Sequence, residues 1–164
     1  TATKAEGRMA VITRASQADA DEILALQRLA YESEARAYND WSLPPLTQTI
    51  EELRQDIADS LVLKATVEGR LVGSVRGRVA DGVCKVGRLI VHPDCQRRGI
   101  GSALLQAIED GFPEAAKYEL FTGSKSDATI RLYERHGYAI TRSERQSEAV
   151  MLVYLEKPGR DAGV

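Results

Sequence analysis

One stretch near the middle of the chain, residues 86–108, most constrains the fold. Residues 86–91 are rich in apolar and β-branched side chains, which predicts a buried strand. Pro93 fixes its own φ and interrupts regular structure, so residues 92–95 are expected to form a turn. From Gly99 onward the apolar side chains recur at helical spacing. The stretch therefore predicts a strand, a tight polar loop and a helix in direct succession.

The predicted loop has the composition of an anion-binding site. The first N–H groups of a helix have no intrahelical partner and lie at the positive end of its dipole. Gly99 and Gly101 lack a Cβ, so a ligand can approach the backbone closely. Ser102 adds a hydroxyl group, and Arg97 and Arg98 add positive charge at the rim. These residues predict a seat for a phosphate or pyrophosphate, with a glycine-rich turn that binds no ligand as the alternative.

Two common phosphate-binding motifs do not fit the residue pattern. A Walker loop requires Gly-x-x-x-x-Gly-Lys-Ser/Thr, which the sequence lacks. A Rossmann fingerprint requires a third glycine, and Leu104 stands where that glycine would be. A small kinase is disfavoured as well, because no lysine follows the glycines and no metal-holding acidic pair is evident.

Two runs carry a resemblance to a known family. Residues 96–101 read Gln-Arg-Arg-Gly-Ile-Gly and follow a strand that ends in Leu-Ile-Val-His-Pro. This arrangement closely resembles the coenzyme A pyrophosphate loop of the GNAT family, the GCN5-related N-acetyltransferases. Residues 126–138 are similar to the family's Asn-x-x-Ala-x-x-Leu-Tyr-Glu-x-x-Gly-Phe segment, with Ser126 in place of the Asn. The resemblance covers most of the chain and is strongest over residues 86–138.

The resemblance implies a fold and a reaction. We expect one α/β (α+β) GNAT-like domain over residues 8–157, with a mixed sheet of about seven strands and about four helices. Residues 1–7 are expected to form a flexible N-terminus and residues 158–164 a polar tail. The implied reaction moves the acetyl group of acetyl-CoA to a primary amine by direct attack in a ternary complex. A non-catalytic coenzyme A-binding or sensor module is the alternative, because the strand before the loop carries no carboxylate.

Periodicity and turn residues predict the individual elements. The strand that follows the central helix should return parallel to the strand that precedes it. Strands are expected at residues 9–13, 61–68, 71–79, 83–91, 117–122, 138–142 and 149–156, and helices at about 16–31, 50–60, 99–111 and 126–136.

The resemblance also implies which residues hold acetyl-CoA, which acts as a cosubstrate without a metal. The main chain at the end of the central strand could bond the pantetheine arm like an added strand. The hydroxyl of Ser126 is shorter than the usual Asn and could reach the cofactor through a water. The expected cofactor-binding residues are Leu89, Ile90, Val91, Gln96, Arg97, Arg98, Gly99, Ile100, Gly101, Ser102 and Ser126.

Two proton transfers need catalytic residues. The resemblance places the hydroxyl of Tyr133 near the thioester sulfur, where it could protonate the departing thiolate. Helical spacing from Ile130 allows Tyr133 to be a core aromatic instead. An amine with a pKa of about 10 must also lose a proton before it attacks. Glu119, an acid of residues 32–40, and bulk water are the candidates to accept that proton.

Aromatic and acidic side chains concentrate in the segment that leads to Pro44 and Pro45. We expect this segment to be irregular and to hold a cationic amine through carboxylates and aromatic faces. The alternative is a helix end that packs its aromatics and solvates its acids. The expected acceptor-binding residues are Tyr31, Glu34, Tyr38 and Trp41. Small amine, amino acid, antibiotic and protein N-terminus all remain open as acceptors, with a small molecule favoured.

Composition limits the partners and the location. With 24 acidic and 22 basic residues the net charge is −2, which argues against a nucleic-acid partner. No apolar run suits a membrane span and no secretion leader is visible, so a cytoplasmic location is expected. Cys84 and Cys95 form no metal-type pair. Cys95 is interpreted as an incidental thiol rather than a nucleophile, and a homodimer stays open because dimers are common among such folds.

Overall fold

The computed structural model of the chain describes residues 2–5 and 8–160, which form eight strands, five α-helices and two short 3₁₀ turns. The strands are β1 Ala2–Ala5, β2 Arg8–Arg14, β3 Leu61–Val67, β4 Arg70–Ala80, β5 Val83–Val91, β6 Lys117–Gly123, β7 Ala139–Arg145 and β8 Met151–Pro158. The helices are α1 Ala20–Tyr38, α2 Pro44–Thr47, α3 Ile50–Asp59, α4 Ile100–Asp110 and α5 Asp127–Arg135, and the 3₁₀ turns are η1 Gln17–Asp19 and η2 Pro93–Cys95.

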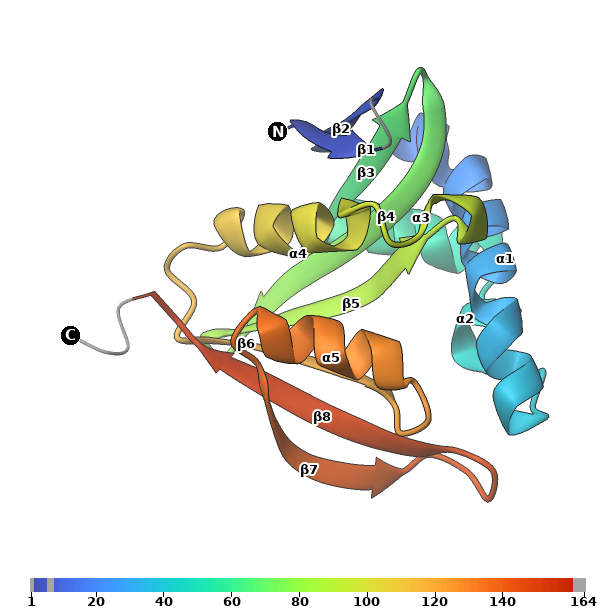
Figure 1. Cartoon of the computed structure of the whole chain (residues 1–164), viewed down its shortest axis with the longest axis vertical. Helices are drawn as coiled ribbons and strands as arrows, with labels where there is room; N and C mark the ends of the chain where they lie inside the picture. Colours follow the sequence, from blue (N-terminus) through green and yellow to red (C-terminus); the bar gives the residue numbers. More distant parts are fainter. Residues whose placement is uncertain (1, 6–7, 161–164) are drawn as a thin grey trace.

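All eight strands belong to one sheet, in the order β1-β2-β3-β4-β5-β6-β8-β7 (Figure 1). Neighbouring strands are antiparallel except β5 and β6, which are parallel because α4 carries the chain back to the start of the next strand. The expected mixed sheet and its one parallel pair are therefore confirmed.

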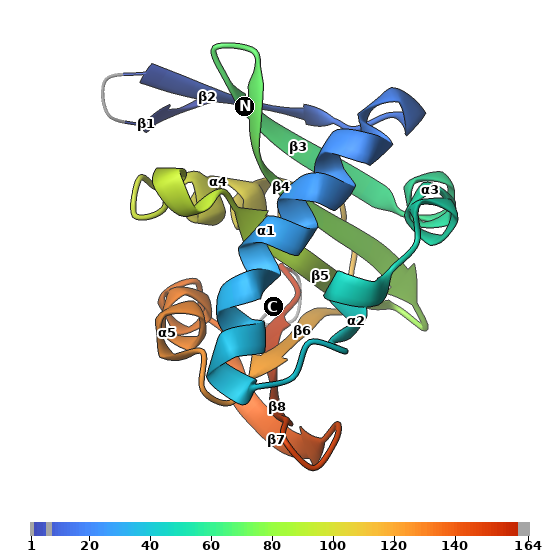
Figure 2. The ribbon, with the colours of Figure 1, turned by 90° about the vertical axis from the view of Figure 1, so that its right-hand side faces the viewer.

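Helices cover both faces of this sheet, with α4 and α5 on one face and α1 and α3 on the other (Figure 2). The larger core holds the fully buried side chains Leu104, Leu105 and Ile108 of α4. The second core packs Ile23 of α1 and Leu53 of α3 against the opposite face. Each such side chain contributes about 1.5–3 kcal/mol when it is buried, so the two cores hold the helices that flank β5.

The first helix is longer than the sequence predicted. It does not end near residue 31 but continues to Tyr38, where Asn39 adopts a left-handed conformation with φ of 49° and closes the last turn. The added turns are stabilised because Ala35 and Tyr38 are buried against Val150. The expectation of an irregular segment was wrong up to Tyr38, and the two prolines act beyond that point.

Two further differences precede β3. Ala2–Ala5 pair with β2 as an antiparallel strand, where the sequence predicted a loose N-terminus; residues 1, 6 and 7 lie outside the described residues. A one-turn helix, α2, begins at Pro44, since proline is tolerated at the first position of a helix. At the other end, β8 reaches Pro158 and the predicted polar tail is described only as far as residue 160.

Local sequence signals set several boundaries as predicted. Thr49 caps α3 because its Oγ1 accepts the N–H of Glu52 at 3.2 Å, while the Glu52 carboxylate accepts the N–H of Thr49 at 2.9 Å. Asp81 and Gly82 both take positive φ in the β4–β5 hairpin. None of the helices within the described residues is both long and apolar enough to cross a membrane.

Candidate active site

The parallel strands β5 and β6 pair only at their beginning. Residues 83–85 face residues 117–119, and beyond that point no further pairing joins the two strands within the described chain. A cavity of about 840 Å³ opens there, lined by side chains and main chain from α1, β4, β5, β6 and α5. The separation leaves one side of β5 without a neighbouring strand beyond residue 85.

A β-bulge interrupts β5 in the part of the strand that no longer pairs with β6. Ser74 of β4 faces Ile90 and Arg76 faces Gly87, so two residues of β5 oppose one residue of β4. Arg88 is one of these two residues of β5, and its φ is 50°. A bulge bends its strand and redirects side chains, and here it brings the Arg88 side chain to the cavity. Sequence reasoning missed this bulge, although a Gly-Arg pair inside an apolar strand was its visible signal.

The loop after β5 has the geometry that a bound anion needs. Arg97 and Gly99 both take positive φ, of 64° and 82°, and α4 begins directly after them at Ile100. A Cβ built on Gly99 would meet nothing within 4 Å, so the space over this turn is open. The first N–H groups of α4 face that space without an intrahelical acceptor. The loop therefore presents a positive, sterically open main chain to a ligand.

The predicted cofactor residues do not all contribute side chains. Leu89, Ile90, Val91 and Gln96 line the cavity. Ile100 is only 1% exposed and belongs to the core, so its main chain alone can face a ligand. The expected roles of the loop residues stay predictions, with the open turn supporting them.

Tyr133 lies on α5 and faces the same cavity. Its side chain is buried and its ring centre lies 6.0 Å from that of Tyr138. Burial raises the pKa of Tyr133, and the nearby groups of Tyr31 and Glu34 raise it further, so the phenol is protonated at neutral pH. Tyr133 therefore both packs in the core and lines the cavity, which are the two positions considered from the sequence.

Helix α1 brings three predicted acceptor residues to the cavity, two of them in its extension beyond residue 31. Tyr31, Glu34 and Tyr38 are spaced three and four residues apart, so they share one face of the helix. Glu34 Oε1 accepts a hydrogen bond of 2.7 Å from Ser126 Oγ, which links α1 to the start of α5. Burial, followed by the charge of Glu34, raises the pKa of Tyr31 to about 12.

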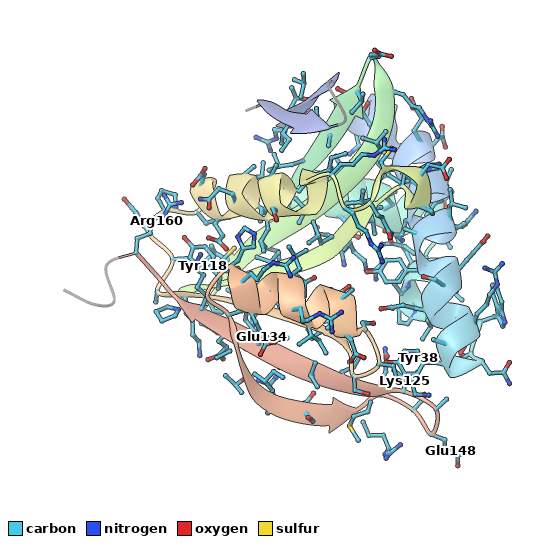
Figure 3. All side chains as sticks on the ribbon, in the orientation of Figure 1. Tyr38, Tyr118, Lys125, Glu134, Glu148 and Arg160 are labelled. Atoms are coloured by element: carbon cyan, nitrogen blue, oxygen red, sulfur yellow. The ribbon has the colours of Figure 1, made fainter. Side chains whose placement is uncertain are left out.

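The end of α1 closes against the loop that follows β6. The hydroxyl of Tyr38 accepts the N–H of Lys125 at 2.8 Å, and the Lys125 ammonium lies 5.0 Å from the ring centre (Figure 3). Trp41, in contrast, is 53% exposed and is not among the residues that line the cavity. The structure therefore brings together three of the four predicted acceptor residues and leaves Trp41 outside.

Glu119 is placed away from the cavity. It sits where β5 and β6 still pair, and its carboxylate contacts Lys85 Nζ at 2.6 Å and an Arg142 guanidinium nitrogen at 3.6 Å. Burial alone would raise the pKa of Glu119, but the hydrogen bond and charge of Lys85, together with Arg142, lower it overall. A carboxylate that holds two cations and does not face the cavity is a poor proton acceptor for a bound amine.

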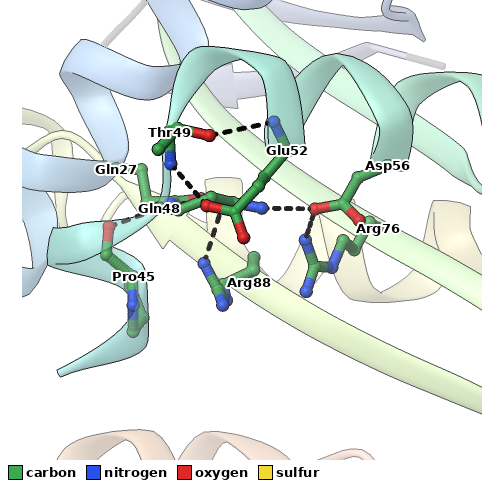
Figure 4. A network of polar contacts seen from close by, with 8 residues as sticks. All are labelled: Gln27, Pro45, Gln48, Thr49, Glu52, Asp56, Arg76 and Arg88. Carbon is green, nitrogen blue, oxygen red and sulfur yellow. Dashed lines mark hydrogen bonds and ion pairs between the residues drawn. The ribbon is translucent and has the colours of Figure 1, made fainter.

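Two arginines form a cationic wall on the other side of the cavity. Arg76 of β4 makes an ion pair with Asp56 of α3, and Arg88 Nη1 donates to Gln48 Oε1 at 3.2 Å (Figure 4). Gln48 in turn donates to Asp56 at 2.6 Å. Sequence reasoning did not identify this network, because its members come from separate elements.

Neither cysteine is placed for chemistry. Cys84 is fully buried and Cys95 is 7% exposed within the larger core. Burial raises the pKa of Cys84 to about 11. The interpretation of Cys95 as an incidental thiol agrees with this position. In the part of the chain that the structure describes, no three His, Cys, Asp or Glu side chains are grouped to hold a metal ion.

Comparison with known proteins adds a sequence match. The profile of the Acetyltransferase (GNAT) family matches residues 21–138. The UPF0157 protein YqkA of Bacillus subtilis is 28% identical over 133 residues, which cover 81% of this chain and 38% of YqkA. The chain therefore spans well under half the length of this curated relative.

Solved structures share the fold at low sequence identity. The PaiA N-acetyltransferase of Thermoplasma acidophilum, in complex with coenzyme A, has a TM-score of 0.76 and 17% identity, over 91% of this chain and 98% of that one. YncA of Salmonella typhimurium, a putative acetyltransferase with its cofactor acetyl-CoA, has a TM-score of 0.71 and 19% identity, over 94% and 96%. The ribosomal-protein-S18-alanine N-acetyltransferase of Escherichia coli has a TM-score of 0.70 and 20% identity, over 93% and 98%.

Proposed function

Because the chain belongs to the Acetyltransferase (GNAT) family, we propose that it transfers the acetyl group of acetyl-CoA to a primary amine of a small molecule. The observation that carries this proposal is the separation of β5 from β6. It creates one cavity that is lined by the β5 main chain, Tyr133 and Glu34. A volume of about 840 Å³ suits the cosubstrate arm and a small acceptor together.

The residues of the loop and of β5 fit acetyl-CoA. The open main chain over Gly99 and the first N–H groups of α4 suit the pyrophosphate, and the unpaired side of residues 89–91 suits an extended arm. Ser126 is already bonded to Glu34, so it orients this carboxylate as well as bordering the arm. Bound acetyl-CoA supplies the activated acyl group, and the protein holds it beside the acceptor in one ternary complex.

Two side chains are suited to the proton transfers. Tyr133 keeps its proton at neutral pH because burial raises its pKa, so it can donate to the departing thiolate. Glu34 lines the cavity and has one carboxylate oxygen occupied by Ser126. We assign proton acceptance from the amine to Glu34, directly or through water, in preference to the ion-paired Glu119.

The experiment is a thiol-release assay with acetyl-CoA and a broad panel of amines. Tyr133→Phe should lower kcat about 100-fold and change the KM for acetyl-CoA little, because general acid catalysis contributes roughly 10²–10⁴-fold. Glu34→Gln should lower the rate, because the amide cannot accept the proton of the attacking amine. The matched control is Tyr154→Phe on β8, outside the cavity, which should retain full turnover.

A non-catalytic coenzyme A-binding module is the second candidate, because β5 carries no carboxylate. It predicts calorimetric binding of coenzyme A without thiol release for any amine in the panel. Full turnover in Tyr133→Phe would remove that residue from the chemistry while leaving the transferase assignment in place.

A further inference from the structure

Six basic side chains line the cavity, and the proposed acetyl transfer uses none of them: Arg76, Arg78, Lys85, Arg88, Lys125 and Arg131. Arg76 and Arg88 both line it, from β4 and from the bulge of β5. They stand beside α3, whereas Tyr133 and Glu34 belong to α5 and α1. The cavity therefore has a cationic wall and, on other elements, a carboxylate.

The two guanidinium groups differ in their partners. Arg76 makes an ion pair with Asp56. For Arg88, the hydrogen bond found within the described chain goes to the neutral amide oxygen of Gln48 at 3.2 Å. That oxygen already accepts a second hydrogen bond, of 2.9 Å, from the buried side chain of Gln27 (Figure 4). Arg88 thus has donors left over for a ligand and no carboxylate within ion-pair distance among the described residues.

The charge of Arg88 therefore has no opposite charge in direct contact among the described residues. Of the neighbouring arginines Arg76 and Arg88, Asp56 neutralises only Arg76 by direct contact. Burial, followed by the charge of Arg76, lowers the pKa of Arg88, which means that its charged form is disfavoured where it stands. An anion placed against the guanidinium would reverse this effect and would occupy its free donors in a planar, bidentate geometry.

The phosphates of the cosubstrate are too far away to be that anion. Arg88 lies three residues before the end of β5, and a strand rises about 3.3 Å per residue, so roughly 10 Å of strand separates it from the loop. The pyrophosphate seat lies still further along, at the start of α4. The acceptor is the ligand that can reach the arginine.

We propose that the acceptor amine carries an acidic group, a carboxylate or phosphonate, that binds Arg88 while the amine lies toward Glu34 and Tyr133. The proposal rests on the proposed acetyl transfer and names its substrate class as amino acids and their close analogues. Arg76 is held in place by Asp56 and adds a second donor group to the same wall. The opposed charges of Arg88 and Glu34 then fix which end of a zwitterion faces the thioester.

Matched acceptors test the proposal directly. Glycine, alanine, phenylalanine and glutamate are compared with their carboxamides, and aminomethylphosphonate is compared with methylamine, in the thiol-release assay. Acids should exceed their amides at least 10-fold in kcat/KM, because a charge-assisted hydrogen bond to the partly buried Arg88 is worth about one to two orders of magnitude. Rates within threefold across every pair would overturn the proposal and leave the acetyl transfer standing.

Variants test whether Arg88 causes the preference for acids over amides. Arg88→Gln should reduce the acid-to-amide ratio to near one without changing the KM for acetyl-CoA, and Arg88→Lys should retain part of it. Arg54→Gln, on the exposed side of α3 and outside the cavity, is the control and should keep the wild-type ratio. A ratio that survives in Arg88→Gln would assign the recognition elsewhere and overturn the proposal.

A binding measurement separates this inference from the reaction. N-acetylglycine and N-acetylglycinamide are titrated by calorimetry into the protein saturated with coenzyme A. Tighter binding of the acid than of the amide, lost in Arg88→Gln, supports acid recognition. This result would hold even if the protein acetylated no amine, an outcome that would count against the transferase alone. The acid recognition is overturned if both compounds bind equally or not detectably and if acids and amides also react at equal rates or not at all.

Discussion

The carboxylate of Glu109 links α4 to strand β8 and to Tyr138, which follows α5. It lies near the end of α4 with its side chain 3% exposed. One oxygen accepts from Lys157 Nζ of β8 at 2.8 Å, and the other accepts from Tyr138 Oη, just after α5, at 2.8 Å. Because Tyr138 also packs 6.0 Å from Tyr133, this buried charge helps to position the proposed general acid.

Replacement of Lys157 by Met tests that role. The change keeps an aliphatic side chain and removes the ammonium, so Glu109 retains only Tyr138 as a side-chain partner in the described structure. Loss of one partner of a buried pair costs about 3–5 kcal/mol. Lys157 is 27% exposed, so we expect the lower end, about 3 kcal/mol. At roughly 2–4 °C per kcal/mol, Tm should fall by about 6–12 °C.

The assay is urea unfolding at pH 7, with the double variant Glu109→Gln/Lys157→Met beside the single one. The double variant leaves no charge unpaired and its amide can still accept from Tyr138, so it should recover more than half of the loss. Lys117→Met is the matched control, because its pair with Glu156 is more exposed and should cost less than about 1 kcal/mol. Purely additive losses in the double variant would refute the reasoning.

Three other outcomes follow from the same contacts. Gly101→Asp should abolish coenzyme A binding in calorimetry, whereas Gly101→Ala should fold normally, since its Cβ would meet Leu132 at an ordinary 3.4 Å. Glu119 has a lowered pKa, so its contribution to stability is present above the unfolded value of about 4.3 and is lost as the pH falls through the folded value. Glu119→Gln should accordingly flatten the fall in urea stability between about pH 5 and pH 2, and an unchanged pH slope would contradict the ion pairs. Cys84, whose pKa burial raises to about 11, should react with a disulfide reagent at pH 8 only after urea unfolds the chain; immediate labelling of Cys84, located by peptide mapping, would contradict its burial.

The sequence determined the central strand, loop and helix, because the signals for these elements are local. Apolar periodicity defines β5 and α4, Pro93 forces a turn between them, and positive φ at residue 99 favours glycine. The parallel pairing of β5 with β6 also follows from the sequence, since a helix lies between them. The resemblance to the family rests on this stretch together with residues 126–138.

Segments that tertiary packing stabilises were harder to predict. Residues 32–38 form part of α1 because Ala35 and Tyr38 find apolar neighbours beyond the helix, including Val150. From composition alone, the same residues were predicted to be irregular. The strand β1 likewise forms through its pairing with β2. The short sequence of β1 does not by itself predict a strand.

Only the tertiary structure decided which charges meet in the site. The hydrogen bond between Glu34 and Ser126 joins residues 92 positions apart, and the ion pair of Lys85 with Glu119 joins residues 34 apart. One contact turns a carboxylate toward the cavity and the other holds one away from it. The sequence could name both acids as candidates, but electrostatic interactions depend on distance in space, and the fold alone sets that distance.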